Sequence, residues 1–229
     1  MKDDRDLYNN KFYIISNCVT NFFITNVLFL IFISPLLLYI YIFEGNSIVV
    51  LLILSMMIGP ALATLFSVMG KFVREKEISA IKDFFHFYKI NLFQGLAVSI
   101  ILNSLIVVLY HDIVYLGVLH QKTLTYILIF LLTIIILLGI YIYPIMSRYN
   151  VKIVYLFRIS IELAIKKFYI TLTSLSVIII AIWALMEVQV LILGPLFGAS
   201  FICYIISYLE RKPIDELEER IKKKYESNV

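Results

Sequence analysis

Long apolar runs separated by short charged segments make up most of the chain, and this pattern predicts a protein that crosses a membrane several times. A helix needs about 20 apolar residues to cross the hydrocarbon core of a bilayer. The first four runs reach that length, and they predict membrane spans at about residues 18–43, 48–69, 92–110 and 123–146.

The last apolar block covers residues 168–209 and is too long for one span. As a single helix it would measure about 63 Å, roughly twice the thickness of the hydrocarbon core. Its only charge is Glu187. The chain is therefore expected to turn back there, which gives spans at about 168–186 and 189–209. The fold predicted is an all-α membrane protein with six transmembrane helices in three hairpins.

Two of the polar connectors have a helical pattern of their own. Between residues 78 and 92 the apolar positions recur every three or four residues, as on one face of a helix. In the connector from Arg148 to Lys167, three charged residues, Arg158, Glu162 and Lys166, stand four apart. Both connectors therefore predict amphipathic helices at the membrane interface.

Positive charge is distributed unevenly between the predicted loops. Nineteen of the 20 Lys and Arg residues fall in the two ends of the chain and in the two amphipathic connectors, whereas only Lys122 falls on the other side. Because Lys and Arg collect in cytoplasmic loops, both termini are expected in the cytoplasm. A single membrane domain at 1–209 is then followed by a short cytoplasmic helix at 210–229, with a narrow apolar seam at Ile214, Leu217 and Ile221.

The composition excludes a soluble globular protein. The 229 residues are 62% hydrophobic and 16% charged, and the mean hydropathy is +0.94. The first apolar run is too long for a signal-peptide core and lacks a small-residue cleavage site, so it predicts an uncleaved helix. Cys18 and Cys203 fall near the cytoplasmic ends of predicted helices, which favours reduced packing residues over a disulfide.

No catalytic pattern stands out in the sequence. No ionisable residue falls in the middle of a predicted span, which argues against a proton- or sodium-coupled transporter. The histidines lie outside the spans, so an intramembrane hydrolase is poorly supported. His111, Asp112 and His120 are irregularly spaced and support a metal site only weakly. We therefore predict neither an enzyme nor a cofactor.

Uncharged polar residues do occur inside the predicted spans, and Asn26, Ser55 and Asn103 are examples. Such side chains usually hydrogen-bond to a neighbouring helix or to the preceding turn of their own helix. We therefore expect them either to hold helices together or to bond back to their own helix.

Proline is concentrated in the predicted spans, where four of the five prolines lie. Each removes a backbone donor and tends to bend its helix, and bent helices either shape the packing or line a site without charged side chains. Residues 59–66 and 194–201 share Gly, Pro and Phe at equal positions, which suggests a parallel internal repeat. The candidate bend or cavity-lining residues are Pro35, Gly59, Pro60, Thr64, Pro144, Gly194 and Pro195.

Candidate docking residues lie on the two amphipathic connectors, because sequence detail collects at the predicted cytoplasmic face while the outer loops are short. ABC permeases also engage their ATPase through an amphipathic helix between two spans, although the glycine and the leucine-proline ending of that motif are missing here. Adhesion of the basic side chains to anionic headgroups is the open alternative. The candidates are Lys71, Arg74, Asp83, Phe84, Phe85, Lys89, Arg158 and Glu162.

Several segments in chain order carry a further likeness. They are Asn26–Pro35 in the first span, Gly59–Phe66 in the second, the basic run Lys71–Arg74, the segment Asp83–Asn91, and Tyr143–Tyr149 at the end of the fourth span. Together they resemble the motifs of the YesL family of bacterial membrane proteins. Members of that family have no assigned reaction and are often encoded beside sugar ABC-transporter components and polysaccharide-degrading enzymes. The resemblance implies a protein of the bacterial cell membrane with a role in carbohydrate uptake or its control.

The favoured function is a non-enzymatic accessory component that lies in the lipid bilayer and docks a partner, such as a sugar ABC-transporter component. The alternative is a transporter or channel for a small neutral solute that works through the proline-bent helices. This alternative predicts a polar, water-accessible cavity near Pro60, Pro144 and Pro195. Binding of nucleic acid is not expected.

Overall fold

The computed structural model describes residues 11–43, 47–187 and 193–226, and every regular element in these ranges is an α-helix. The helices are α2 (Lys11–Phe43), α3 (Ile48–Ser55), α4 (Ile58–Glu75), α5 (Ala80–Val118), α6 (Lys122–Arg148), α7 (Ile153–Lys166), α8 (Phe168–Glu187), α9 (Leu193–Leu209) and α10 (Arg211–Glu226). The all-α prediction is confirmed for these residues.

Four segments in the described part of the chain are long and apolar enough to cross a membrane. They are Ser16–Phe43, Ile48–Glu75, Ala80–Val118 and Lys122–Arg148. A fifth span results if α7 and the first part of α8, which meet at 95°, are counted together. The apolar part of α9, Leu196–Leu209, is shorter. Length and composition thus support four or five spans, and the turn predicted after Glu187 lies outside the described residues.

Helix α5 departs most from the prediction. The expected interfacial helix at 78–92, the span at 92–110 and the polar loop after it form one continuous helix from Ala80 to Val118. Its 39 residues give it a length of about 58 Å. The predicted boundary at residue 92 is wrong, because the amphipathic and the apolar stretches both follow the helical period and no proline separates them.

The second predicted span is divided. Helix α3 ends at Ser55, Met56 and Met57 form a turn, and α4 then continues past the predicted end at 69 as far as Glu75. The charged segment that begins at Lys71 is therefore helical. Helices α3 and α4 together still make one candidate span.

The glycine–proline pairs begin helices. Gly59 and Pro60 are the second and third residues of α4, and Gly194 and Pro195 have the same place in α9. The first N–H groups of a helix have no partner within it, so a proline there removes no helical hydrogen bond. The two matching segments thus share a local structure as well as a pattern.

Helix α4 is at the centre of the packing. Twelve of its 18 residues are buried, and it packs on α2, α5, α6 and α9. Two hydrophobic clusters meet at this helix: Ala63 joins α5, α6, α7 and α10, while Leu65 joins α2 and α9. Helix α4 therefore positions the four helices that pack on it.

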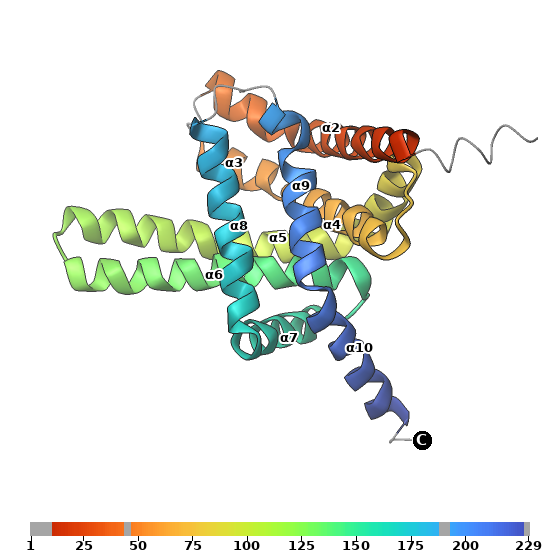
Figure 1. The fold of residues 1–229 in the computed structure, drawn as a ribbon. Coiled ribbons are helices and arrows are strands. Elements are labelled where there is room, and N and C mark those ends of the chain that lie inside the picture. Colours follow the sequence, from red (N-terminus) through yellow and green to blue (C-terminus); the bar gives the residue numbers. More distant parts are fainter. Residues whose placement is uncertain (1–10, 44–46, 188–192, 227–229) are drawn as a thin grey trace, which may run out of the picture.

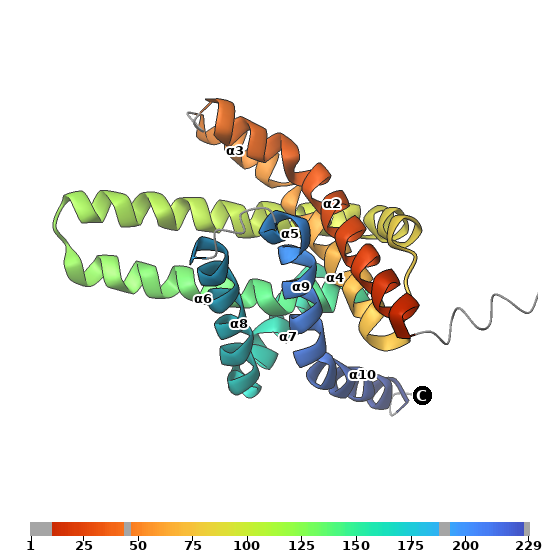
Figure 2. The ribbon, with the colours of Figure 1, turned by 45° about the horizontal axis from the view of Figure 1, so that its top comes forward.

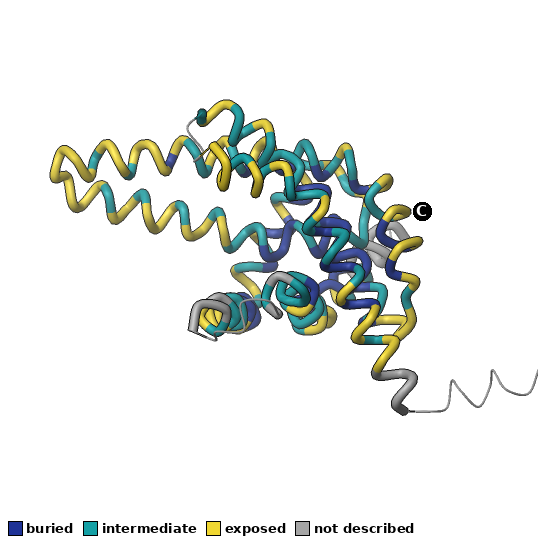
Figure 3. Tube along the Cα trace, turned by 90° about the horizontal axis from the view of Figure 1, so that it is seen from above, coloured by how far each residue is buried: buried dark blue, intermediate teal, exposed yellow. Residues whose placement is uncertain are grey.

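Helices α5 and α6 form an antiparallel hairpin that projects well beyond the other helices (Figures 1 and 2). Its outer half is mostly exposed (Figure 3), with large apolar side chains such as Val118, Tyr126 and Phe130 at its surface. In a membrane-embedded protein this surface suits contact with lipid. Helices α8 and α9 run steeply across the hairpin in both ribbon views rather than alongside it.

The charged end of the chain is packed on the helices. Helix α7 matches the second predicted amphipathic helix and buries Leu156, Ile159 and Leu163. Ile214 and Leu217 of α10 are buried in the same cluster. Three contacts between charged or polar side chains add to this: Arg148 with Asp215 at 2.8 Å, Tyr149 with Glu218 at 2.8 Å, and Lys167 with Glu216 at 2.8 Å. The predicted tail helix exists, and its apolar seam is part of the core.

Candidate functional site

Small and polar residues face one another where α5 crosses α3 and α4. Those on α3 and α4 are Ser55, Gly59 and Ser67, and those on α5 are Asn91, Gly95, Ser99 and Asn103. Spacing in fours places the α5 residues on one helical face. Since glycine has no side chain, the backbones touch: a Cβ on Gly59 would lie 2.4 Å from the carbonyl oxygen of Gly95.

The side-chain amides of this contact bind across it. Asn103 Nδ2 donates to Ser55 Oγ at 3.0 Å, and Asn91 Nδ2 donates to Ser67 Oγ at 2.8 Å. Unsatisfied polar groups are costly within a bilayer, so these bonds hold the helices together. The expectation that Ser55 and Asn103 join helices is confirmed.

The turn between α4 and α5 is held by an ion pair. Both carboxylate oxygens of Asp83 lie 2.9 Å from Lys71 Nζ, and Oδ2 also accepts the backbone N–H of Ser79 at 2.9 Å. The N–H of Ala80 donates to Asn21 Oδ1 of α2 at 3.3 Å. The first turn of α5 is thus attached to both α4 and α2.

A broad groove, which we call the α4–α5 groove, lies beside this turn and has a volume of about 630 Å³. It is lined by Lys71, Arg74, Glu75, Lys82, Asp83, Phe85, His86, Phe87 and Lys89. Five of these residues belong to the predicted docking set. Both acids interact with Lys71, at 3.9 Å for Glu75 and 2.9 Å for Asp83. Within the described residues, Arg74, Lys82 and Lys89 have no ion pair, so the groove presents positive charge.

Phe84 and Phe85 have different environments, although both were predicted to dock a partner. Phe85 lines the groove and is 45% exposed. Phe84 is fully buried and packs against Phe32 of α2, with ring centroids 5.6 Å apart. The helical period places adjacent residues about 100° apart, which is why only one of them faces outward.

The remaining predicted docking residues, Arg158 and Glu162, are on α7 and do not line the groove. Glu162 pairs with Lys166 on the same helix at 2.6 Å.

Among the predicted bend residues, Thr64 is buried and donates to the carbonyl of Pro60 at 2.7 Å. The hydroxyl of Thr64 therefore donates its hydrogen bond within its own helix.

The other predicted bend residues are spread through the fold. Pro35 and Pro144 lie inside α2 and α6, which continue through them. Gly194 is partly buried in the first turn of α9, and the side chain of Pro195 is outside the described part of the structure. Only Pro144 of this set lines one of the two pockets described here.

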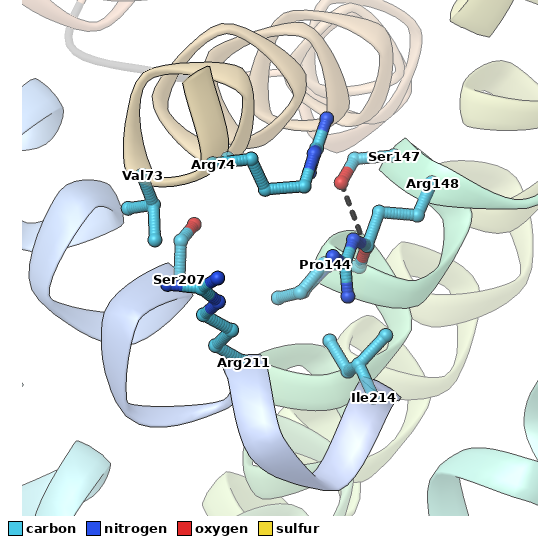
Figure 4. A pocket seen from close by; sticks show the side chains of 9 residues that line it. Val73, Arg74, Pro144, Ser147, Arg148, Ser207, Arg211 and Ile214 are labelled. Carbon is cyan, nitrogen blue, oxygen red and sulfur yellow. Dashed lines mark hydrogen bonds between the residues drawn. The ribbon is translucent and has the colours of Figure 1, made fainter. Parts of the chain in front are cut away.

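The second pocket, which we call the arginine pocket, lies where α4, α6, α9 and α10 meet (Figure 4). It is lined by Gly70, Val73, Arg74, Pro144, Ser147, Arg148, Ser207, Arg211 and Ile214. Three arginines at the ends of three helices thus come together. Asp215 lies beside two of them, with Oδ1 at 2.8 Å from Arg148 Nη1 and Oδ2 at 3.7 Å from Arg211 Nε.

Glu210 is a buried acid near the same junction. It connects α9 to α10 and is fully buried. Neither carboxylate oxygen has a hydrogen-bond partner within the described residues. Burial raises the pKa of this carboxyl well above its usual range, because the charged form loses its hydration.

Sequence reasoning missed the arginine pocket and the burial of Glu210. Arg148 and Arg211 were assigned to a connector and a tail, and Glu210 looked like the first charge of a soluble segment. The apolar seam of Ile214 and Leu217 could have indicated that the tail packs on the other helices, since an apolar stripe on a charged helix usually faces a core. No group of three or more potential metal ligands occurs in the part of the chain that the structure describes.

Residues 21–113 match the family described as "Protein of unknown function, DUF624". The chain is similar to this family over that segment. The match runs from α2 into α5 and so includes the α4–α5 contact and the groove. No curated protein and no solved structure matches the chain. Together with the long apolar helices, this similarity supports a membrane-embedded protein of unknown activity.

Proposed function

We propose that the protein is a non-enzymatic membrane component that docks an acidic segment of a cytoplasmic partner protein in the α4–α5 groove. The observation that supports this most directly is the lining of the groove. Arg74, Lys82 and Lys89 have no ion pair within the described residues, and they line the same groove as the exposed ring of Phe85.

This combination suits one class of partner. Cations without fixed counter-ions attract an acidic segment and steer its approach, and an exposed aromatic ring offers an apolar anchor beside them. The ion pair of Lys71 with Asp83 holds the wall of the groove in place without a partner. The proposed partner segment therefore carries Asp or Glu residues around one apolar side chain.

The proposal also includes a topology. The groove lies on a connector rich in Lys and Arg, which favours the cytoplasmic side of a bacterial cell membrane with both termini inside. Six spans remain part of this proposal: α3 with α4 counts as one, and α2, α5, α6, α8 and α9 supply the others. This count requires α8 and α9, which run steeply across the α5–α6 hairpin, to turn toward the direction of the hairpin in a bilayer. A tag placed after Val229 that is labelled from outside an intact cell would contradict this topology.

The resemblance to the YesL family supports a more specific partner. We propose that the acidic segment belongs to a component of carbohydrate uptake, such as a subunit of a sugar ABC transporter. The alternative occupant of the groove is the membrane itself, because basic side chains beside an aromatic ring also suit anionic headgroups.

Substitution of Phe85 separates these occupants. Full-length protein is purified in mild detergent, and the bound partner is measured for the wild type, Phe85→Ser and a control, Tyr155→Ser, which alters an exposed aromatic ring on α7. We expect Phe85→Ser to keep its melting temperature and to lose most of the partner, and Tyr155→Ser to keep both. Phe84→Ser is unsuitable, because a buried ring is lost and the protein is destabilised.

The chemistry of the partner is tested with peptides. A Glu-rich peptide with one Leu is expected to displace the partner, and a Lys-rich peptide of the same length is not. Without any peptide, release of the partner should also increase with salt, since exposed charges are screened. Recovery of no partner by the wild type, or equal recovery by Phe85→Ser, would exclude docking in the groove.

Solute transport is the second candidate, and the polar lining beside Pro144 is the observation in its favour. The free volume there is about 20 Å³, which is close to the space that one water needs. Near Pro60, α4 and α5 touch through their backbones, so a solute could pass between them only if they separated. Uptake of a neutral sugar by liposomes that contain the purified protein would favour this function over docking.

A further inference from the structure

The arginine pocket brings together three guanidinium groups from distant parts of the chain. Arg74 is in the last turn of α4, Arg148 is the last residue of α6, and Arg211 is the first residue of α10. Figure 4 shows their side chains around one opening, with the side chain of Ser207 on the wall between them. No acidic residue is part of the lining.

The pocket contains more positive charge than the neighbouring acid balances. Asp215 takes one short contact with Arg148 and one longer contact with Arg211, at 2.8 and 3.7 Å. No hydrogen bond or ion pair within the described residues uses the guanidinium of Arg74. The charge of Arg148 opposes it, and Glu75 and Asp215 attract it from beyond ion-pair distance. At least one set of N–H donors is therefore open toward the pocket.

Helix dipoles explain part of this arrangement. An arginine at the C-terminal end of a helix is favoured by the partial negative charge there. This effect acts on Arg74 and Arg148, in the last turns of α4 and α6, and not on Arg211, which is the first residue of α10. It would operate equally well if the side chains pointed apart. It does not require that Arg74, Arg148 and Arg211 line one pocket.

A phosphate group matches what is shared by these side chains. The guanidinium fork donates two parallel hydrogen bonds to phosphate oxygens, and a phosphate accepts from several donors at once. A carboxylate would satisfy fewer of them, and Asp215 already supplies one. The serine hydroxyl of Ser207 is a further donor on the wall of the pocket.

The side chains differ in their freedom to move. Arg148 is held by Asp215, and its side chain is 15% exposed, whereas the side chain of Arg211 is 48% exposed. Arg74 is also exposed. The free volume of about 20 Å³ is smaller than a phosphate group, so binding requires Arg74 and Arg211 to swing outward while Arg148 remains in place.

We infer that the arginine pocket binds a phosphate-bearing anion. The pocket is at the end of the helices, beside the predicted membrane interface, so the phosphate belongs either to an anionic lipid headgroup or to a soluble phosphorylated compound. Both sources share the same recognition by Arg74, Arg148 and Arg211.

The test compares two probes on full-length protein purified in phospholipid-free detergent. The first probe is inorganic phosphate, and the melting temperature is measured against chloride at equal ionic strength. The second is phosphatidylglycerol, whose retention is measured by native mass spectrometry with phosphatidylcholine as the neutral comparison. A gain with inorganic phosphate indicates a soluble ligand, and selective retention of phosphatidylglycerol indicates a lipid. Either result supports the pocket.

The variants Arg74→Gln and Arg211→Gln locate the site, and Arg158→Gln on α7 is the matched control because it removes an exposed arginine elsewhere. Arg148→Gln is not used, since it would also release Asp215. We expect each pocket variant to weaken binding of the positive probe about tenfold, and the control to stay near the wild type. Binding of neither probe, or an equal loss in Arg158→Gln, would overturn the inference.

Discussion

Gly59 of α4 and Gly95 of α5 are in direct backbone contact. A Cβ on Gly59 would lie 2.4 Å from the Gly95 carbonyl oxygen, and a Cβ on Gly95 would lie 2.7 Å from the Cα of Pro60. Both distances are below the 3.0 Å that real Cβ contacts respect, and the neighbouring atoms are backbone atoms that cannot rotate away. This pair therefore sets the separation of the two helices that build the α4–α5 groove.

Substitution of either glycine should force these helices apart. We expect Gly59→Ala or Gly95→Ala to lower stability by about 1–3 kcal/mol, as overpacking does in other cores. Thermal unfolding of the purified protein measures the effect. Gly117→Ala is the control, because a Cβ there meets nothing within 4 Å and alanine favours the helix by up to about 1 kcal/mol. Equal melting temperatures for Gly59→Ala and the wild type would contradict the contact.

The turn that follows α4 contains a strained residue. Lys76 ends the helix with φ of 63°, a left-handed conformation that costs an L-residue about 1–2 kcal/mol and glycine almost nothing. Lys76→Gly is therefore expected to raise stability by about 1 kcal/mol. Its neighbour Glu77 has a negative φ, and Glu77→Gly should give no gain. If both variants shift the melting temperature alike, the left-handed conformation of Lys76 makes no contribution of its own.

The docking of α10 makes the tail part of the fold. Ile214 is 2% exposed in the cluster that includes Leu156 and Tyr141, so Ile214→Ala should lower stability by about 2–4 kcal/mol. Glu219→Ala on the exposed side of α10 serves as the control and should change it little. A free tail would give the same melting curve for both variants, and that outcome would exclude the docked arrangement.

Glu210 should make stability depend on pH in an unusual direction. Its pKa is raised in the folded protein, so between the ordinary pKa of a glutamate and the raised value the folded state binds more protons than the unfolded state. Stability from this group is complete below the ordinary pKa and is lost as the pH rises toward the raised one. Glu210→Gln is expected to remove this decline. At neutral pH its free energy of unfolding should exceed that of the wild type by about 1–3 kcal/mol.

Melting curves between about pH 4 and pH 9 check this expectation. The control is Glu219→Gln, because the side chain of Glu219 is exposed on α10, the helix that follows Glu210. A parallel pH dependence of the wild type and Glu210→Gln would show that the buried carboxyl makes no contribution. In that case its surroundings would have to supply a partner for the charged form.

Much of the secondary structure could be predicted, and its boundaries could not. The apolar runs identified the helices and the spacing of Arg158, Glu162 and Lys166 identified α7, because both signals depend on hydrophobicity and on the helical period. The division at residue 92 failed for the same reason, since one period runs through both halves of α5. Lys71 and Arg74 could be chosen as docking candidates from the sequence, because charge next to an apolar stripe is a local feature, and both line the α4–α5 groove.

Contacts between distant segments could not be predicted from the sequence. Residue chemistry alone establishes that these helices are apolar and that the Lys and Arg residues gather in a few connectors, because each side chain has that property wherever it lies. Which helix is central, which of Phe84 and Phe85 faces outward, and which arginines share a pocket depend on how α4, α6 and α10 pack together. Packing is decided by the shapes of many side chains at once, and only the folded arrangement contains that information.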